Sequence, residues 1–168
     1  TDAVAQAAED RLLAALDDWR SANPELPIGR ADLDTETKRQ LLAVNRGFRT
    51  LADIEYKSGF LYRDDADIQY DAFAVRKVLA SNDNAGYVML ETLLPLLAAV
   101  EPWSQQELER VIASVCESRG VKMGDVAQPL RVAVAGTTVS PAIYDTLVLL
   151  GKQHTLTRIR RVLELRAS

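Results

Sequence analysis

Residues 123–163, MGDVAQPLRVAVAGTTVSPAIYDTLVLLGKQHTLTRIRRVL, contain the clearest local structure signals in this chain. Pro129 is typical of a first helical turn, and Gly136 is expected to end the helix that follows. Ser140 and Pro141 form a second start signal, because a serine side chain caps free amides and a proline needs no amide partner. The stretch therefore predicts short helices separated by tight turns.

The end of the chain is expected to form a basic helix over residues 152–166, after a stop at Gly151. Five Lys and Arg residues against Glu164 give this segment a net charge of +4 with His154 neutral, which leaves −8 for the rest of the chain. A basic end on an acidic body is consistent with one RNA-facing surface. A solvated helix end would have the same composition.

The rest of the chain follows the helical period. Apolar residues recur at helical spacing over 2–22 and 105–119, and Ser104 with Glu107 has the pattern of a capping box before the second of these helices. Thr50 is expected to cap a further helix. No segment shows the alternation of a strand. The predicted fold is all-α, a helical bundle or cage of about eight to ten helices in two packed subdomains.

The composition fits an ordinary globular protein, with 168 residues, 48% hydrophobic and 26% charged. No apolar run approaches the ~20 residues that cross a membrane. Cys116 is the single cysteine, so no internal disulfide can form, which fits a reducing compartment. We therefore expect a cytoplasmic protein without a membrane partner.

Residues that carry catalysis or bind metals are sparse in this sequence. It has no glycine-rich phosphate loop, and one Cys with one His does not make a structural zinc site. His154 is expected to lie at the surface, and Asp64, Asp65 and Asp67 to form a solvated loop. We expect no catalytic residue, no metal site and no cofactor in this chain.

Four short motifs, in this order and spacing, resemble the C-terminal region of bacterial glutamyl-tRNA synthetases, which are class I aminoacyl-tRNA synthetases. They are FRTLAD (48–53), AQPLRVAVAG (127–136), SP (140–141) and LLGK (149–152). The resemblance extends over roughly residues 30–165. Because it covers only the end of that family's chain, and the first residue is Thr1, we expect a piece of a longer protein.

The resemblance implies a role in tRNA recognition. In that family this region binds the anticodon arm of tRNA(Glu), and a separate catalytic domain of the same chain performs the ATP- and Mg²⁺-dependent aminoacylation. It implies that residues 1–29 are a helix and linker from the catalytic part, that 30–67 contact the tRNA stem, and that 68–168 read the anticodon. Partners would be tRNA(Glu) and the catalytic domain, with no DNA.

The resemblance also implies contacts with RNA at particular positions. These are Gln128, Pro129, Leu130, Arg131, Ser140, Pro141 and Ile143 in the distal part, Arg46, Arg49 and Lys57 upstream, and Lys152 and Arg158 in the basic end. An arginine can bond to or stack on an unstacked base, and a helix start can donate to a phosphate. Pro141 and Ile143 would form an apolar shelf for a base.

Two structural alternatives remain open. Arg131 would serve the fold alone if it paired with Asp125 or Asp145, and Ser140 with Pro141 caps a helix with or without RNA. A helical protein-interaction or regulatory domain would share the fold without binding tRNA. The RNA reading requires Arg131, Ser140 and the basic last helix to share one exposed face.

Overall fold

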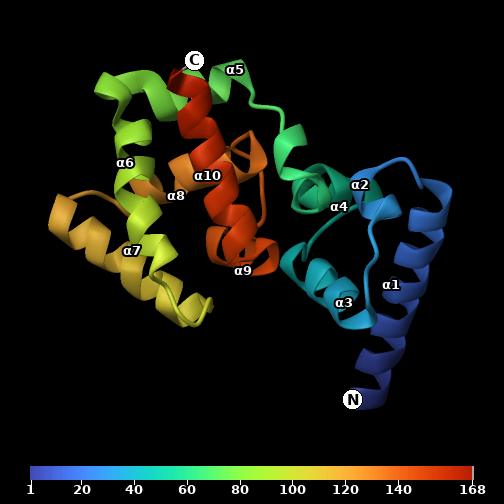
Figure 1. Ribbon diagram of the computed structural model, residues 1–168. Helices are drawn as coiled ribbons and strands as arrows, with labels where there is room; N and C mark the ends of the chain where they lie inside the picture. The colour runs from blue at the N-terminus through green and yellow to red at the C-terminus, as the bar shows by residue number, and fades with distance from the viewer. Residues whose placement is uncertain (168) are drawn as a thin grey trace. The chain divides into compact units, whose positions relative to one another are not determined.

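The computed structural model describes residues 1–167, and no β-strand occurs among them (Figure 1). The all-α prediction is confirmed. Contacts divide the chain into two units, the first spanning Thr1–Arg63 and the second beginning at Asp64. None of the described helices has the length and apolarity needed to cross a membrane.

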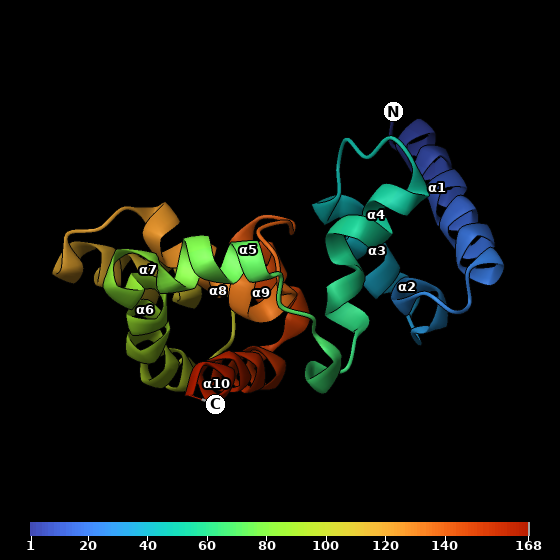
Figure 2. The same cartoon turned by 90° about the horizontal axis from the view of Figure 1, so that it is seen from above.

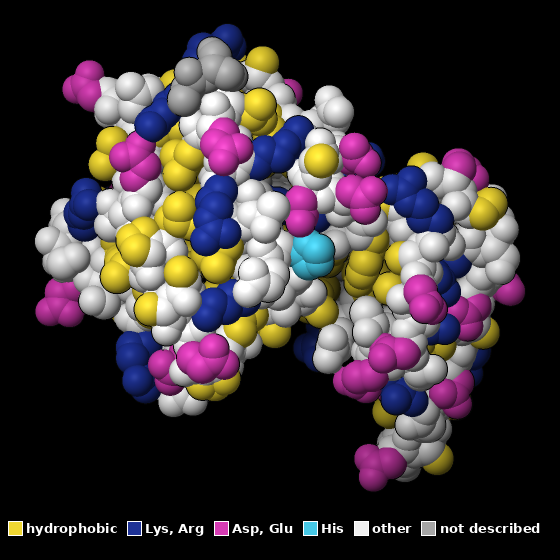
Figure 3. All heavy atoms as spheres, viewed as in Figure 1, with side chains coloured by type: hydrophobic (Ala, Val, Ile, Leu, Met, Phe, Trp, Pro, Cys, Tyr) yellow, Lys and Arg dark blue, Asp and Glu magenta, His cyan; other side chains and the backbone are white. Residues whose placement is uncertain are grey.

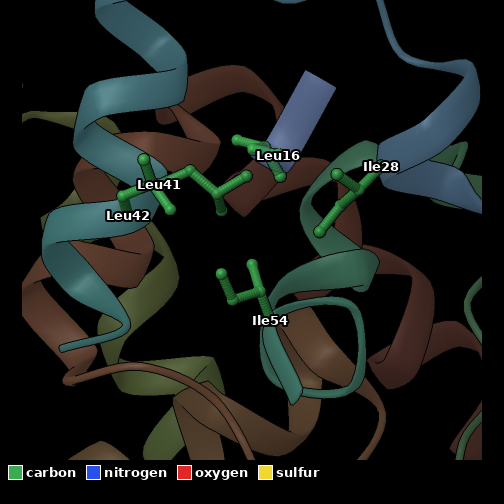
Figure 4. Close-up of a cluster of buried hydrophobic side chains, with 5 residues drawn as sticks. All are labelled: Leu16, Ile28, Leu41, Leu42 and Ile54. Atoms are coloured by element: carbon green, nitrogen blue, oxygen red, sulfur yellow. The ribbon is translucent and has the colours of Figure 1, made fainter. Parts of the chain in front are cut away.

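The first unit is built on a small apolar core. Its elements are α1 (Asp2–Ala22), α2 (Pro27–Arg30), α3 (Thr35–Val44), α4 (Leu51–Ser58) and the 3₁₀ turn η1 (Gly59–Tyr62). Side chains from the four α-helices point toward one another in this core (Figure 4): Leu16, Ile28, Leu41, Leu42 and Ile54. Each such burial stabilises the fold by roughly 1.5–3 kcal/mol.

The linker expected near residues 24–29 is a structured part of this unit. Pro27 begins α2, and Ile28 has 0% of its surface exposed. The predicted helix over 2–22 is confirmed as α1, but Val4 and Leu12 on its apolar side are 66% and 41% exposed. The core therefore covers α1 only toward its C-terminal end.

The second unit is larger and carries most of the predicted site. Its elements are η2 (Asp65–Asp67), α5 (Ala72–Ala74), the π-helical turn η3 (Val75–Ala80), α6 (Ser81–Ala98), α7 (Gln105–Arg119), α8 (Met123–Ala135), α9 (Ile143–Leu150) and α10 (Lys152–Ala167). Helices α6, α8 and α10 pack against one another, and η3 lies beside α8 (Figure 2). Fully buried Leu90, Val132 and Ile159 come from these three helices.

Helix α8 differs from its predicted boundary. It begins at Met123, because the Asp125 carboxylate accepts the Lys122 amide at 3.1 Å and opens the helix there. Pro129 therefore lies inside the helix, not in its first turn. The predicted stop at Gly136 is confirmed, with φ at +82° and an added Cβ 2.0 Å from the Gln69 carbonyl oxygen.

Candidate nucleic-acid interface

Three of the predicted site residues form one hydrogen-bonded group, with Gln128 and Arg131 on α8 and Ser140 in the turn that follows it. The Arg131 Nε donates to the Ser140 Oγ at 2.8 Å, and its Nη1 donates to the Gln128 Oε1 at 3.0 Å. The Ser140 hydroxyl donates to the Pro141 carbonyl at 2.6 Å, and the Thr146 hydroxyl lies 3.3 Å from the Ser140 Oγ. The turn after α8 thus fixes the direction of the Arg131 guanidinium.

Arg131 has no acidic partner within the described part of the chain. The alternatives that paired it with Asp125 or Asp145 are not realised, because its bonds go to the neutral side chains of Gln128 and Ser140. It is half-buried, and this burial lowers the pKa of its guanidinium. A partly desolvated cation without a counter-ion favours binding of an anion such as a phosphate.

The apolar members of the predicted site face the interior of the unit. Leu130 has 0% and Ile143 5% of its surface exposed, and Pro129 and Pro141 are also buried. The predicted apolar shelf of Pro141 and Ile143 therefore does not fit the structure. These residues pack the core beneath the Arg131 group instead.

Ser140 is not the N-cap of α9, contrary to the sequence-based expectation. The helix begins at Ile143, and the preceding Ala142 has no side chain to cap it. The Ser140 hydroxyl is occupied by the Pro141 carbonyl and by the Arg131 guanidinium. A serine two residues further from the helix thus holds the arginine rather than the free amides.

Arg158 is a buried structural residue. Its surface is 0% exposed, its Nε bonds to the Asp65 Oδ1 at 2.7 Å, and its Nη1 donates to the Val134 carbonyl at 2.8 Å. Asp65 also bonds to His154 at 2.8 Å. Burial raises the pKa of Asp65, but the bonds from Arg158 and His154 outweigh it and lower the pKa overall. The expectation that Asp65 lies in a solvated loop is wrong.

Three further cations of α10 also bond within the unit, whereas Arg160 is exposed. The Lys152 Nζ donates to the Val100 carbonyl at 2.8 Å, Arg161 donates to the Ile68 carbonyl at 2.8 Å, and Arg166 pairs with Glu91. Figure 3, in the orientation of Figure 1, shows basic and acidic side chains interspersed over α10. The last helix is therefore not the continuous basic face that we expected to share with Arg131.

The upstream candidates gather in a hollow of the first unit. Arg46, Arg49 and Lys57 line it together with Asp53 and Tyr56, whose side chain is 75% exposed. Asp53 accepts the backbone amides of Thr50 and Arg49, and these bonds lower its pKa. The Thr50 cap predicted for this helix is confirmed. The hollow combines three cations with an exposed aromatic ring.

A second group in the same unit as Arg131 was not predicted. Phe73 on α5 is 60% exposed, and the Arg76 guanidinium carbon and Lys77 Nζ lie 5.7 and 5.8 Å from the centre of its ring. Phe73 and Lys77 line a hollow together with Gln128 and Thr137. The sequence contained one signal for this group, the spacing of Arg76 and Lys77 three and four positions after Phe73. Residues at these positions lie on the same side of a helix.

The structure thus describes an all-α domain whose exposed cations and aromatic rings suit contact with a nucleic acid. Comparison with known families gives a concordant result. Residues 5–163 match the family described as the anticodon binding domain, and the chain belongs to that family.

Relatives of known name agree with this assignment. A glutamate–tRNA ligase 1 of Alkalilimnicola ehrlichii is 37% identical over 141 residues, covering 82% of this chain and 29% of that protein. A glutamate–tRNA ligase 1 of Syntrophus aciditrophicus is 35% identical over 155 residues, covering 91% and 30%. The chain therefore spans less than a third of these relatives.

A solved structure shares the fold. The crystal structure of a glutamate tRNA ligase from Elizabethkingia meningosepticum superposes with a TM-score of 0.73 over 91% of this chain and 29% of that one. The sequences are 19% identical in this comparison, so it supports the architecture alone.

Proposed function

We propose that this chain is the tRNA-binding module of a glutamate–tRNA ligase, and that it recognises the anticodon arm of tRNA(Glu). Membership of the anticodon binding domain family and the names of the relatives support this proposal. Single-stranded RNA loops are read by side chains that stack on bases and bond to their edges, and the residue types around Arg131 suit this task. No observation favours the alternative of a protein-interaction domain.

The main support for the proposal is the environment of the Arg131 side chain. It is half-buried, held in direction by Gln128 and Ser140, and has no carboxylate partner in the described structure. A guanidinium used only for packing would need a compensating acid or a set of carbonyls, as Arg158 has. The site thus retains a positive charge that can donate hydrogen bonds to a base edge or be neutralised by a phosphate.

The test is a titration of a labelled tRNA(Glu) transcript with the 168-residue chain, followed by fluorescence anisotropy. Arg131→Ala is expected to weaken binding by roughly 1–3 kcal/mol while far-UV circular dichroism stays unchanged. Arg166→Ala is the matched control, because Arg166 already pairs with Glu91 and should matter little. A transcript with a substituted anticodon tests the arm, since the Arg131 effect should shrink with it.

Salt dependence tests whether phosphate contacts contribute to binding, and the Arg131 variant and the substituted anticodon separate a specific site from nonspecific electrostatic binding. Each phosphate contact to a single strand contributes about −0.7 to the slope of log affinity against log salt. Absence of binding at low salt, or equal affinities for the Arg131 and Arg166 variants, would argue against an RNA site at Arg131.

The catalytic role of a longer protein follows from the same proposal. Aminoacylation, with its ATP and Mg²⁺, would belong to a catalytic domain of the parent ligase, in the cytoplasm. This module would orient the tRNA for that reaction. Adding it in excess should then compete with the intact ligase for tRNA(Glu) and slow aminoacylation, and the Arg131→Ala module should compete less.

A further inference from the structure

We propose that the exposed ring of Phe73 is a stacking platform for one unpaired nucleotide of the bound RNA, and that Lys77 holds the phosphate of that nucleotide. This inference rests on the proposed function and adds a second contact point to it. It comes from the structure of the α5–η3 segment and not from the residues that the family resemblance suggested.

The environment of Phe73 differs from that of a core aromatic residue. Phe60 is 7% exposed, whereas Phe73 is 60% exposed. The next residue, Ala74, is 4% exposed and Leu79 is 0% exposed, so the segment is anchored by its other side chains. The ring is therefore presented to solvent on a fixed turn of helix, which is what a stacking platform needs.

The hollows beside the ring share Gln128, a residue bonded to Arg131. One hollow is lined by Phe73, Lys77, Gln128 and Thr137, and an adjoining hollow is lined by Lys77, Gln128 and Pro129. Gln128 is the residue that also accepts from the Arg131 guanidinium at 3.0 Å. A strand that contacts Arg131 would therefore pass Gln128 on its way to Phe73.

Two cations lie at the exposed ring. Arg76 and Lys77 have their cationic groups over the Phe73 ring, and neither forms an ion pair within the described structure. Asp71 and Asp125 also line these hollows, and each carboxylate accepts an amide in a helix cap, Asp71 from Ala74 at 2.9 Å and Asp125 from Lys122 at 3.1 Å. The cations at the ring, and not the whole lining, are therefore the phosphate contacts. A phosphate backbone places anionic groups next to these cations at every nucleotide, which suits RNA.

The ring makes the groove suited to unpaired bases in particular. A base stacked on an aromatic side chain gains affinity whatever its identity, since every base has a π-face. The cations beside the ring neutralise the adjacent phosphate, as in grooves that follow a single strand. The side chains of Gln128, Thr137 and Thr138 supply hydrogen-bonding groups along the same wall.

The experiment compares Phe73→Ala, Phe73→Tyr and the wild-type chain in binding a tRNA(Glu) transcript. Phe73→Ala is expected to weaken binding by about 5- to 150-fold, and Phe73→Tyr to retain it, because tyrosine keeps the ring. Leu96→Ala is the matched control, since Leu96 is a 42% exposed apolar residue on α6. It should bind like the wild-type chain.

The salt slope distinguishes the two parts of the platform. Lys77→Ala should make the slope shallower by about 0.7, the share of one phosphate of a single strand, and Phe73→Ala should leave it unchanged. A Phe73→Trp chain should also show fluorescence quenching on binding beyond that of the wild-type chain, which contains Trp19 and Trp103.

The outcomes separate this inference from the proposed function. If the wild-type chain binds tRNA(Glu), Arg131→Ala weakens binding, and Phe73→Ala binds as well as Phe73→Tyr, the platform is refuted while the function stands. Equal quenching for the Trp variant and the wild-type chain would count against it in the same way. If the wild-type chain does not bind at low salt, the proposed function fails and takes the platform with it.

Discussion

Removing the carboxylate of Asp65 should destabilise the second unit by about 3 kcal/mol. Asp65→Ala leaves the Arg158 guanidinium, whose surface is 0% exposed, without the carboxylate that its Nε contacts at 2.7 Å. Losing one partner of a buried ion pair costs roughly 3–5 kcal/mol, because the other charge stays buried. The lower end of this range applies, since the Asp65 side chain is 20% exposed and water can replace part of the interaction.

The assay should report on the second unit alone. Trp103 lies in that unit, with its Nε1 donating to the Leu147 carbonyl at 2.8 Å, whereas Trp19 packs in the first unit. Urea unfolding followed by tryptophan fluorescence in a Trp19→Phe background therefore reads the right transition. Asp67→Ala, an exposed aspartate of the same turn, is the matched control and should change the unfolding free energy by no more than about 0.5 kcal/mol.

Two results would refute the reasoning. A difference below about 1 kcal/mol between the Asp65 and Asp67 variants would mean that the buried charge does not depend on Asp65. The pH dependence gives the second check. Because the folded pKa of Asp65 is lowered, its stabilisation is present above about pH 4, the unfolded value, and is lost as the pH falls through the folded value. A gap between the wild type and Asp65→Ala that widens on acidification would contradict this sign.

Three other substitutions test two helix ends and the core of the first unit. Gly136→Ala should destabilise the fold by roughly 3 kcal/mol or more, because it adds a clash with the Gln69 carbonyl to the cost of a positive φ. Gly120→Ala is its control, since no atom lies near the added Cβ, and it should cost only about 1–2 kcal/mol. Thermal or urea unfolding measures both. Glu55→Gln should raise the urea midpoint at neutral pH, since burial raises the folded pKa of Glu55 and its Oε1 has no hydrogen-bond partner. A raised pKa stabilises the fold only below the unfolded value of about 4.3, and this effect is lost as the pH rises. The higher midpoint of Glu55→Gln should therefore disappear in acid. A lower midpoint than that of the wild type at neutral pH would contradict this prediction.

Local signals in the sequence predicted local structure well. Gly136 ends α8, Gly151 ends α9, and Thr50 caps α4, because each of these features depends only on residues within one helical turn. Ser140 does not cap α9, because its hydroxyl takes part in a long-range contact that local signals do not show. Its hydroxyl bonds to Arg131, nine residues earlier, and that contact is set by how α8 and α9 pack.

Long-range contacts determine which basic residues are exposed and unpaired. Local sequence patterns do not predict these contacts. Arg158 and Asp65 are 93 residues apart, so neither the burial of the first nor the pairing of the second follows from its neighbours. Phe73 had a local signal, in the basic residues that follow it, but its exposure depends on which side of α5 the core lies. Prediction from residue type named Gln128, Arg131 and Ser140, which the structure brings together, but did not anticipate that Leu130, Ile143 and Arg158 are buried.

The distribution of the cations bears on the proposed RNA contact, because the net charge of the chain is −4. Several cations bond to carbonyls or carboxylates of their own unit and so contribute to the stability of the fold: Lys152, Arg158 and Arg166. Arg131 and Lys77 have no acidic partner in the described structure. Lys77 and Gln128 both line two adjoining hollows, and Gln128 accepts a hydrogen bond from Arg131. Affinity for a polyanion depends on charges that remain uncompensated at the surface, and not on the sum over the chain. Substitutions in the hollows lined by Lys77 and Gln128 should therefore change the affinity for RNA. Substitutions of the bonded cations of α10 should change mainly the free energy of unfolding.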